Sequence, residues 1–167
     1  GYYFLTSSVE LPKFIEYTDK LIANKSLEIT SFNDYYLYEK DEVNLINTGR
    51  VFLCDMFSQS QLSRNYTIKI PNILKETASI SVAAAHVAVV EASMDVTVNE
   101  SLLGTPIFPP RVVNKNAATK INVRYNFYPA NSNEIQLKLT YRNSASTAYL
   151  DYFVINCKRR LQKIEGD

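Results

Sequence analysis

Apolar and polar residues alternate along much of this chain, and this pattern limits the folds that are open to it. The alternation is clearest in three runs, at residues 66–70, 121–127 and 135–141. Successive side chains of a β-strand point to opposite faces of a sheet, so each run predicts a strand with one buried face. Antiparallel sheets commonly have one buried and one solvated face. The chain is therefore expected to be built mainly from antiparallel strands.

Further strands are predicted from composition. The run from Ser79 to Val90 is small and apolar at nearly every position, which is typical of a central strand covered on both faces. Met94–Val98 alternates, and Ala148–Cys157 is rich in aromatic and β-branched residues. Shorter strands are predicted at Tyr2–Leu5, Lys13–Tyr17 and Leu27–Ser31.

Two segments carry signals for other structure. Leu103–Pro110 contains one Gly and three Pro, which predicts a loop. Asp41–Asn47 predicts one or two helical turns, because Asp41 can cap the first turn and Gly49 suits a left-handed stop. A short helix over Phe14–Ile22 is an alternative to the strand expected there.

These elements predict an all-β fold, a two-sheet antiparallel β-sandwich of Ig-like or jelly-roll-like type with at most short helices. Roughly eight or nine strands would fill its two layers. A chain of 167 residues can build one domain with its own core, whereas two domains would be cramped. Residues 1–167 are therefore expected to form a single β-sandwich domain.

Charge and cysteine content exclude several classes of function. The formal net charge is only +1, so no strong field favours nucleic acid, and the basic run Lys158–Arg160 is expected to be a solvated exit from the last strand. No apolar stretch reaches the ~18 residues of a membrane span, so direct membrane insertion is not expected. With one His and no C-x-x-C motif, neither a zinc site nor a cofactor is expected.

Cys54, Cys157 and His86 are the residues from which a thiol hydrolase could be built. A histidine can lower the pKa of a thiol and accept its proton. His86, however, lies within a run expected to be buried in a sheet, whereas nucleophiles usually lie on loops or strand ends. We therefore expect a structural histidine and two buried or half-buried free thiols.

A cluster of carboxylates offers a second possible site, at Glu39, Asp41, Glu42 and Asp55. Two carboxylates can flank a glycosidic bond or bind Ca²⁺. Lys40 interrupts the cluster, and the regular Asp/Asn spacing of a calcium loop is missing. The favoured interpretation is a solvated turn with one carboxylate paired to Arg50, an ion pair that could hold the turn to the sheet.

Tyrosine is abundant, with 12 residues, and no Trp is present. Exposed Tyr rings could form a sugar-stacking platform, and the chain would then be a carbohydrate-binding module of a surface enzyme. Tyr and Phe are also ordinary strand residues, which favours a role in the core.

The segment from Asp34 to Phe57 carries a more specific pattern. It contains Tyr38-Glu39-Lys40-Asp41, Asn44-Leu45, Gly49-Arg50 and a closing Phe57. Before it stands Tyr2-Tyr3-Phe4-Leu5-Thr6, and after it stand Val96–Asn99 and Leu150–Asn156 with Arg159–Leu161. In this order the elements resemble the N-terminal, non-catalytic region of PorU-like, gingipain-related (C25-type) peptidases of the Bacteroidetes type IX secretion system. Phe52 stands where that family tends to have Trp, and Cys54-Asp55 replaces Gly-Glu.

The resemblance implies an accessory β-sandwich domain on the extracellular face of the outer membrane. Its partners would be a downstream peptidase domain of the same chain and secreted cargo or secretion-system proteins. The family's catalytic His and Cys belong to that downstream domain, after residue 167, so no catalytic residue is expected here. A lone Gly1 with no initiator Met also predicts a piece of a longer multidomain protein. Glu39, Asp41, Gly49 and Arg50 are expected to form a loop that braces the sandwich.

Overall fold

Ten strands account for most of the residues that the computed structural model describes, which are 28–45, 52–113, 118–131 and 133–162. The strands are β1 (Ser31–Glu39), β2 (Met56–Phe57), β3 (Ser63–Lys69), β4 (Ala78–His86), β5 (Ala92–Val98), β6 (Ser101–Gly104), β7 (Ile107–Phe108), β8 (Thr119–Phe127), β9 (Glu134–Tyr141) and β10 (Ala148–Arg160). The predicted strands at 66–70, 79–90, 94–98, 121–127, 135–141 and 148–157 are confirmed as β3, β4, β5, β8, β9 and β10, with shifted ends.

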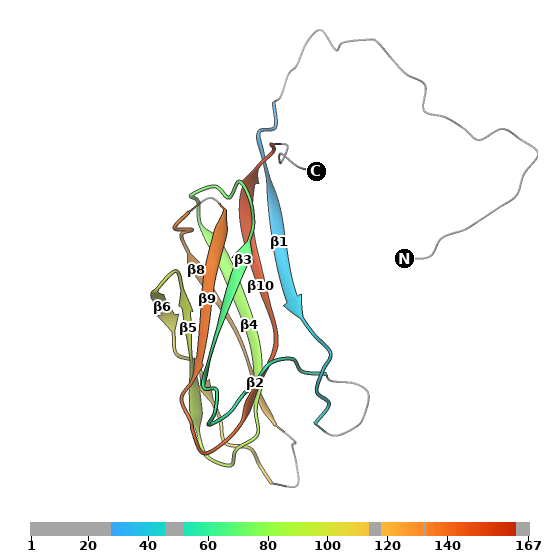
Figure 1. Ribbon diagram of the computed structural model, residues 1–167, viewed down its shortest axis with the longest axis vertical. Helices are drawn as coiled ribbons and strands as arrows, with labels where there is room; N and C mark the ends of the chain where they lie inside the picture. The colour runs from blue at the N-terminus through green and yellow to red at the C-terminus, as the bar shows by residue number, and fades with distance from the viewer. Residues whose placement is uncertain (1–27, 46–51, 114–117, 132, 163–167) are drawn as a thin grey trace, which may run out of the picture.

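The strands form two antiparallel sheets of five strands each, packed face to face (Figure 1). The first sheet has the order β1-β10-β4-β8, with β2 beside β10. The second has the order β3-β9-β5-β6, with β7 beside β5. The predicted all-β, two-sheet antiparallel sandwich is therefore confirmed. The described residues contain no helix, and so none that could cross a membrane.

The core lies between the sheets and follows the alternation of the sequence. In β9, Ile135, Leu137 and Leu139 are at most 1% exposed, while Gln136 and Lys138 between them face solvent. Burial of each such apolar side chain contributes about 1.5–3 kcal/mol to stability. Strand β4 is buried on both faces, as the run from Ser79 predicts, but it ends at His86, and Val89 and Val90 beyond it are exposed.

The loop predicted at Leu103–Pro110 is partly wrong. Leu103 and Gly104 belong to the short strand β6 and Ile107 and Phe108 to β7, and both strands pair with β5. Pro106 separates them, although its carbonyl still accepts a hydrogen bond from the Met94 amide. Gly and Pro thus shorten the strands here without preventing edge pairing.

The helical turns predicted at Asp41–Asn47 are wrong for the part that is described. Val43 instead forms a β-bridge with Leu53, and their backbones exchange hydrogen bonds of 2.8 and 2.7 Å. A β-branched Val in an extended backbone fits this arrangement. Ile46, Asn47 and the elements expected at 2–5, 13–17 and 14–22 lie outside the described residues.

The strand expected at Leu27–Ser31 lies in a different place. Residues 28–30 are not part of a strand, and β1 begins at Ser31 and runs to Glu39. It pairs along its whole length with β10, from Ser31 opposite Arg160 to Glu39 opposite Tyr152. The Tyr-rich start of the segment from Asp34 to Phe57 is therefore a strand, which the sequence did not predict.

Candidate functional site

Asp55 is the centre of the polar contacts in the segment from Asp34 to Phe57. Its Oδ2 atom accepts hydrogen bonds from the hydroxyl of Tyr38 at 2.8 Å and from that of Tyr66 at 2.9 Å. Arg64 Nη1 lies 3.6 Å from Oδ1, and the Asp55 side chain is only 11% exposed. Tyr38 belongs to the first sheet and Tyr66 to the second, so one carboxylate connects both layers.

The rings of these two tyrosines pack on Phe153 of β10. Tyr38 is stacked on Phe153 with ring centroids 4.9 Å apart and planes 8° apart. Tyr66 meets the rings of both Phe153 and Tyr38 edge-on at 5.2 Å. Burial, and next the hydrogen bond to Asp55, raise the pKa of Tyr66, while burial raises the pKa of Tyr38. Both hydroxyls thus stay protonated and can donate to the carboxylate.

The residues expected to brace the sandwich are only partly described. Glu39 and Asp41 are exposed, and Gly49 and Arg50 lie outside the described residues. The predicted pairing of Arg50 with a carboxylate therefore stays a prediction. The Asp55–Tyr38–Tyr66 contact was missed, because hydrogen bonds between residues 11 and 17 positions apart follow no sequence periodicity.

His86 lies in the interior, as predicted, and its described partner is a tyrosine rather than a cysteine. Its Nδ1 atom is 2.8 Å from the hydroxyl of Tyr141, which is 2.6 Å from Oγ of Ser146. The ring stacks on Phe108 with centroids 5.3 Å apart. Burial lowers the pKa of His86, so the histidine is held neutral.

Both cysteines are buried free thiols, as expected. Cys54 Sγ donates to the carbonyl of Asp151, and burial raises the pKa of both thiols. Neither thiol therefore has the lowered pKa that an activated nucleophile needs. Among the described residues, no group of three His, Cys, Asp or Glu side chains is placed to hold a metal ion.

The outer face of the first sheet carries a polar groove. Its floor follows β4, whose outward side chains Ser79, Ser81, Ala83 and Ala85 are small. Larger side chains from β8 and β10 stand on both sides. At one end they meet above β4, where Lys120 pairs with Asp151 at 3.0 Å and Asn122 donates to Tyr152 at 3.2 Å.

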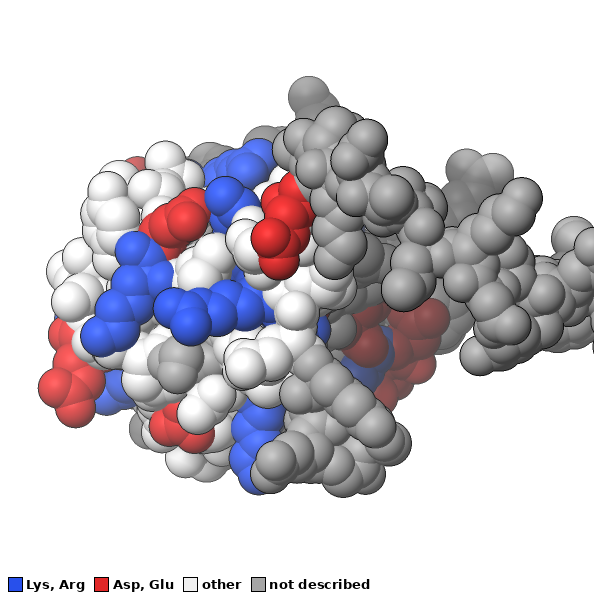
Figure 2. Space-filling view, turned by 90° about the horizontal axis from the view of Figure 1, so that it is seen from above, with Lys and Arg blue, Asp and Glu red and all other residues white. Residues whose placement is uncertain are grey.

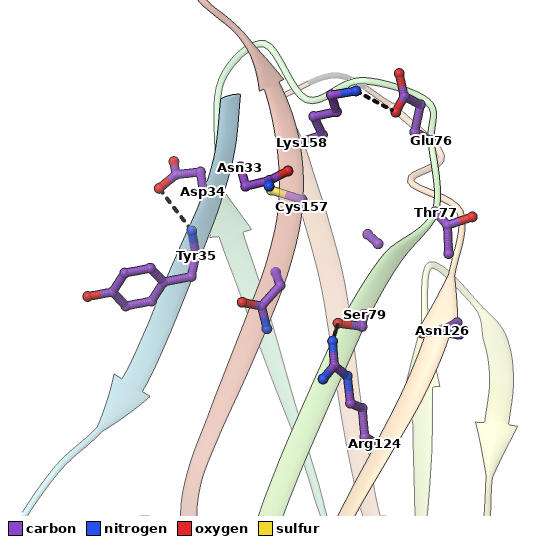
Figure 3. Close-up of a pocket in the computed structure, with 12 residues that line it drawn as sticks. Asn33, Asp34, Tyr35, Glu76, Thr77, Ser79, Arg124, Asn126, Cys157 and Lys158 are labelled. Carbon is purple, nitrogen blue, oxygen red and sulfur yellow. Dashed lines mark hydrogen bonds and ion pairs between the residues drawn. The ribbon is translucent and has the colours of Figure 1, made fainter. Parts of the chain in front are cut away.

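At the other end the face stays open as a groove of about 640 Å³. Its polar lining comes from β1, β10, β4 and β8 and from the segment before β4: Asn33, Asp34 and Tyr35 of β1, Asn156 and Lys158 of β10, Glu76, Thr77 and Ser79, and Arg124 and Asn126 of β8. Figure 3 shows Arg124 reaching to Ser79, whereas the ring of Tyr35 points away from the groove. The volume is that of an ordinary ligand pocket.

The charges at this end of the sandwich are mostly paired. Seen from above, Lys and Arg side chains gather here with Asp and Glu between them (Figure 2). Lys158 contacts Glu76 at 3.2 Å, and Arg159 contacts Asp34 at 2.6 Å. Arg159 also lies over the ring of Phe32. In the basic run Lys158–Arg160, Arg160 is exposed, whereas Lys158 and Arg159 are half-buried.

Comparison with known proteins gives structural but no sequence matches. No family model and no curated protein sequence matches this chain. Among solved structures, the dimeric latent PorU of Porphyromonas gingivalis is similar, with a TM-score of 0.70 and 18% identity over 84% of this chain. The chain spans only 14% of that PorU chain. At this identity the likeness shows a shared fold.

Two carbohydrate-binding modules resemble the chain more distantly. One is the CBM36-1 domain of a xylanase from the hindgut metagenome of Trinervitermes trinervoides, with a TM-score of 0.45 and 12% identity over 73% of this chain and 96% of the module. The other is a family 35 module from an environmental isolate, with a TM-score of 0.46 and 14% identity over 71% of this chain and 90% of the module.

Replacement of Asp55 by Ala is expected to lower the free energy of unfolding by about 2–3 kcal/mol, because two half-buried hydroxyls lose their acceptor. Urea denaturation measures the loss. Asp151→Ala, which removes a carboxylate paired with the exposed Lys120, is the matched control and should cost about 1 kcal/mol or less. Equal losses in the two variants would contradict the role of Asp55. Combining Asp55→Ala with Tyr66→Phe should cost less than the sum of the single changes.

Protonation of His86 should make stability depend on pH. The pKa of His86 in the folded state lies below its ordinary value of 6.5. As the pH falls through 6.5, the unfolded chain therefore binds a proton at His86 while the folded chain does not. The free energy of unfolding should therefore decrease from pH 7.5 toward pH 5. His86 is the only histidine, so His86→Gln should remove this slope while lowering stability at pH 7.5. An unchanged slope in the variant would refute the assignment.

Proposed function

We propose that this chain is a non-catalytic accessory domain of a PorU-like, C25-type cysteine peptidase linked to type IX secretion. The observation that supports this most is the shared fold with PorU over 84% of the chain. The sequence elements from Tyr38 to Phe57, in the order typical of that family, support it independently. On this proposal the domain acts at the cell surface, and catalysis belongs to a domain after residue 167.

The chemistry of the described residues agrees with a non-catalytic role. The two thiols are buried with raised pKa values, and His86 contacts Tyr141. A cysteine peptidase needs an accessible thiol next to a base that can take its proton.

We propose that the domain packs against the downstream peptidase domain. By this packing it would help to position cargo or secretion-system partners. Ile29, Phe32 and Leu161 form an exposed apolar group where β1 begins and β10 ends, at 63%, 36% and 64% exposure. The Leu161 amide bonds to the Thr30 carbonyl, so these residues lie together. A following domain would emerge beside this group and could cover it.

Carbohydrate binding is the second candidate function. Its support is the polar groove on the first sheet, whose amide and hydroxyl side chains suit sugar hydroxyls. The tyrosine rings give carbohydrate binding less support, because those described do not form a platform for sugar stacking. Tyr36, Tyr38, Tyr66, Tyr125 and Tyr141 are buried or pack against the core, and the exposed rings of Tyr35 and Tyr128 stand at opposite edges of the sheet.

The purified chain, assayed alone, is expected to hydrolyse no peptide, because neither thiol is activated. A panel of fluorogenic peptides at pH 7.5 with a reducing agent checks this. Cleavage that disappears in a Cys54→Ser or Cys157→Ser variant would overturn the non-catalytic assignment.

Packing on a downstream domain can be tested by hydrogen exchange in the longer protein and in this chain alone. The amides of Ile29, Phe32 and Leu161 should exchange more slowly in the longer protein, because a partner surface covers them. Val112 and Val113, exposed near the opposite end, are the internal control and should exchange equally in both. Equal exchange at all five positions would refute the proposed contact.

A further inference from the structure

Arg124 is the charged side chain of the groove whose charge no described carboxylate balances. The other three charged residues of the lining are paired, Asp34 with Arg159 and Glu76 with Lys158. The described partner of the Arg124 guanidinium is neutral, the Oγ atom of Ser79 at 2.9 Å. The open groove therefore carries one positive charge that no described carboxylate pairs with.

Ser79 gives this guanidinium a fixed position. Ser79 is buried at 6% exposure on β4, and its hydroxyl holds Nη2 of Arg124, which reaches across from β8 (Figure 3). A guanidinium has five N–H donors, and one is used here. The remaining donors can form the two parallel hydrogen bonds by which arginine binds a carboxylate.

Three amide side chains line the same groove: Asn33 of β1, Asn156 of β10 and Asn126 of β8. All three are exposed, and within the described part of the chain none has a hydrogen bond from its side chain. Each amide offers both donors and an acceptor, which is what a sugar hydroxyl requires. They spread over the width of the sheet, about 14 Å at the usual strand spacing, so they suit an extended ligand.

We propose that this groove binds an acidic saccharide, a sugar chain that bears a carboxylate. Arg124 binds the carboxylate, Ser79 positions Arg124, and the amides of Asn33, Asn126 and Asn156 contact the hydroxyls. The proposal rests on the second candidate function, carbohydrate binding, and names its ligand class. An acidic peptide also has a carboxylate but lacks the row of hydroxyls that three free amides fit.

Calorimetric titration of the chain with oligomers of galacturonic and glucuronic acid tests the proposal, with their methyl esters as neutral probes of the same sugars. At least one acid should bind about tenfold more tightly than its ester or more, as expected for a hydrogen-bonded charge pair. Arg124→Gln should abolish the preference. Lys69→Ala removes an exposed charge on β3 in the other sheet and should preserve it.

Each other outcome decides against part of the proposal. Equal binding of acid and ester, or a preference that survives in Arg124→Gln, overturns the acidic ligand but leaves carbohydrate binding standing. If a short Asp-rich peptide binds as tightly as the acidic sugars, the assignment of the ligand as a saccharide is overturned. If no sugar binds, both the inference and the carbohydrate candidate fail, while hydrogen exchange still decides the accessory-domain proposal separately. Because Arg124 and Lys69 are exposed, both variants should fold, and matching thermal unfolding curves verify this.

Discussion

The hydrogen bonds from Tyr38 and Tyr66 to one oxygen of Asp55 hold the two sheets together along the side where β1 and β3 are edge strands. Apolar burial drives the sheets together but sets no direction, so two layers could slide over each other at little cost in buried area. A carboxylate that accepts from two half-buried hydroxyls restricts that freedom, since a shift leaves a donor without its partner. Phe153, packed against both rings, adds a shape constraint at the same place.

Two other contacts also fix the position of one sheet relative to the other. Where β4 ends, His86 of the first sheet meets Tyr141 of the second at 2.8 Å. At the other side of the sandwich, Tyr125 of β8 packs so closely on Gly104 of β6 that a Cβ atom there would lie 2.6 Å from its hydroxyl oxygen. Any other residue at position 104 would therefore force the Tyr125 ring to move, so Gly104 permits this close packing of the two edge strands. The sandwich is thus fixed at both sides and at one end.

The sequence predicts the strands well where one face is buried, and poorly where pairing rather than burial decides. Alternation identifies β8 and β9 because every second residue is apolar. It misses β1, where Asn33, Tyr35 and Leu37 face solvent and the pattern is blurred, and it misses β6 and β7, which depend on hydrogen bonds to β5. The polar contacts were beyond sequence reasoning for a similar reason, because Asp55 finds its partners only after both sheets have formed.

The carboxylates and aromatic residues between Asp34 and Phe57 suggest chemistry in the sequence, yet the structure assigns most of them to internal contacts. Asp34 is paired with Arg159 and Asp55 is enclosed by tyrosines, so neither is free for a ligand. Side chains whose hydrogen-bonding capacity remains unused in the described chain gather instead on the outer face of the first sheet. There the small side chains of β4 leave space, and a rigid sheet holds Arg124 in place. A ligand that contacts this face would therefore meet side chains with free donors and acceptors.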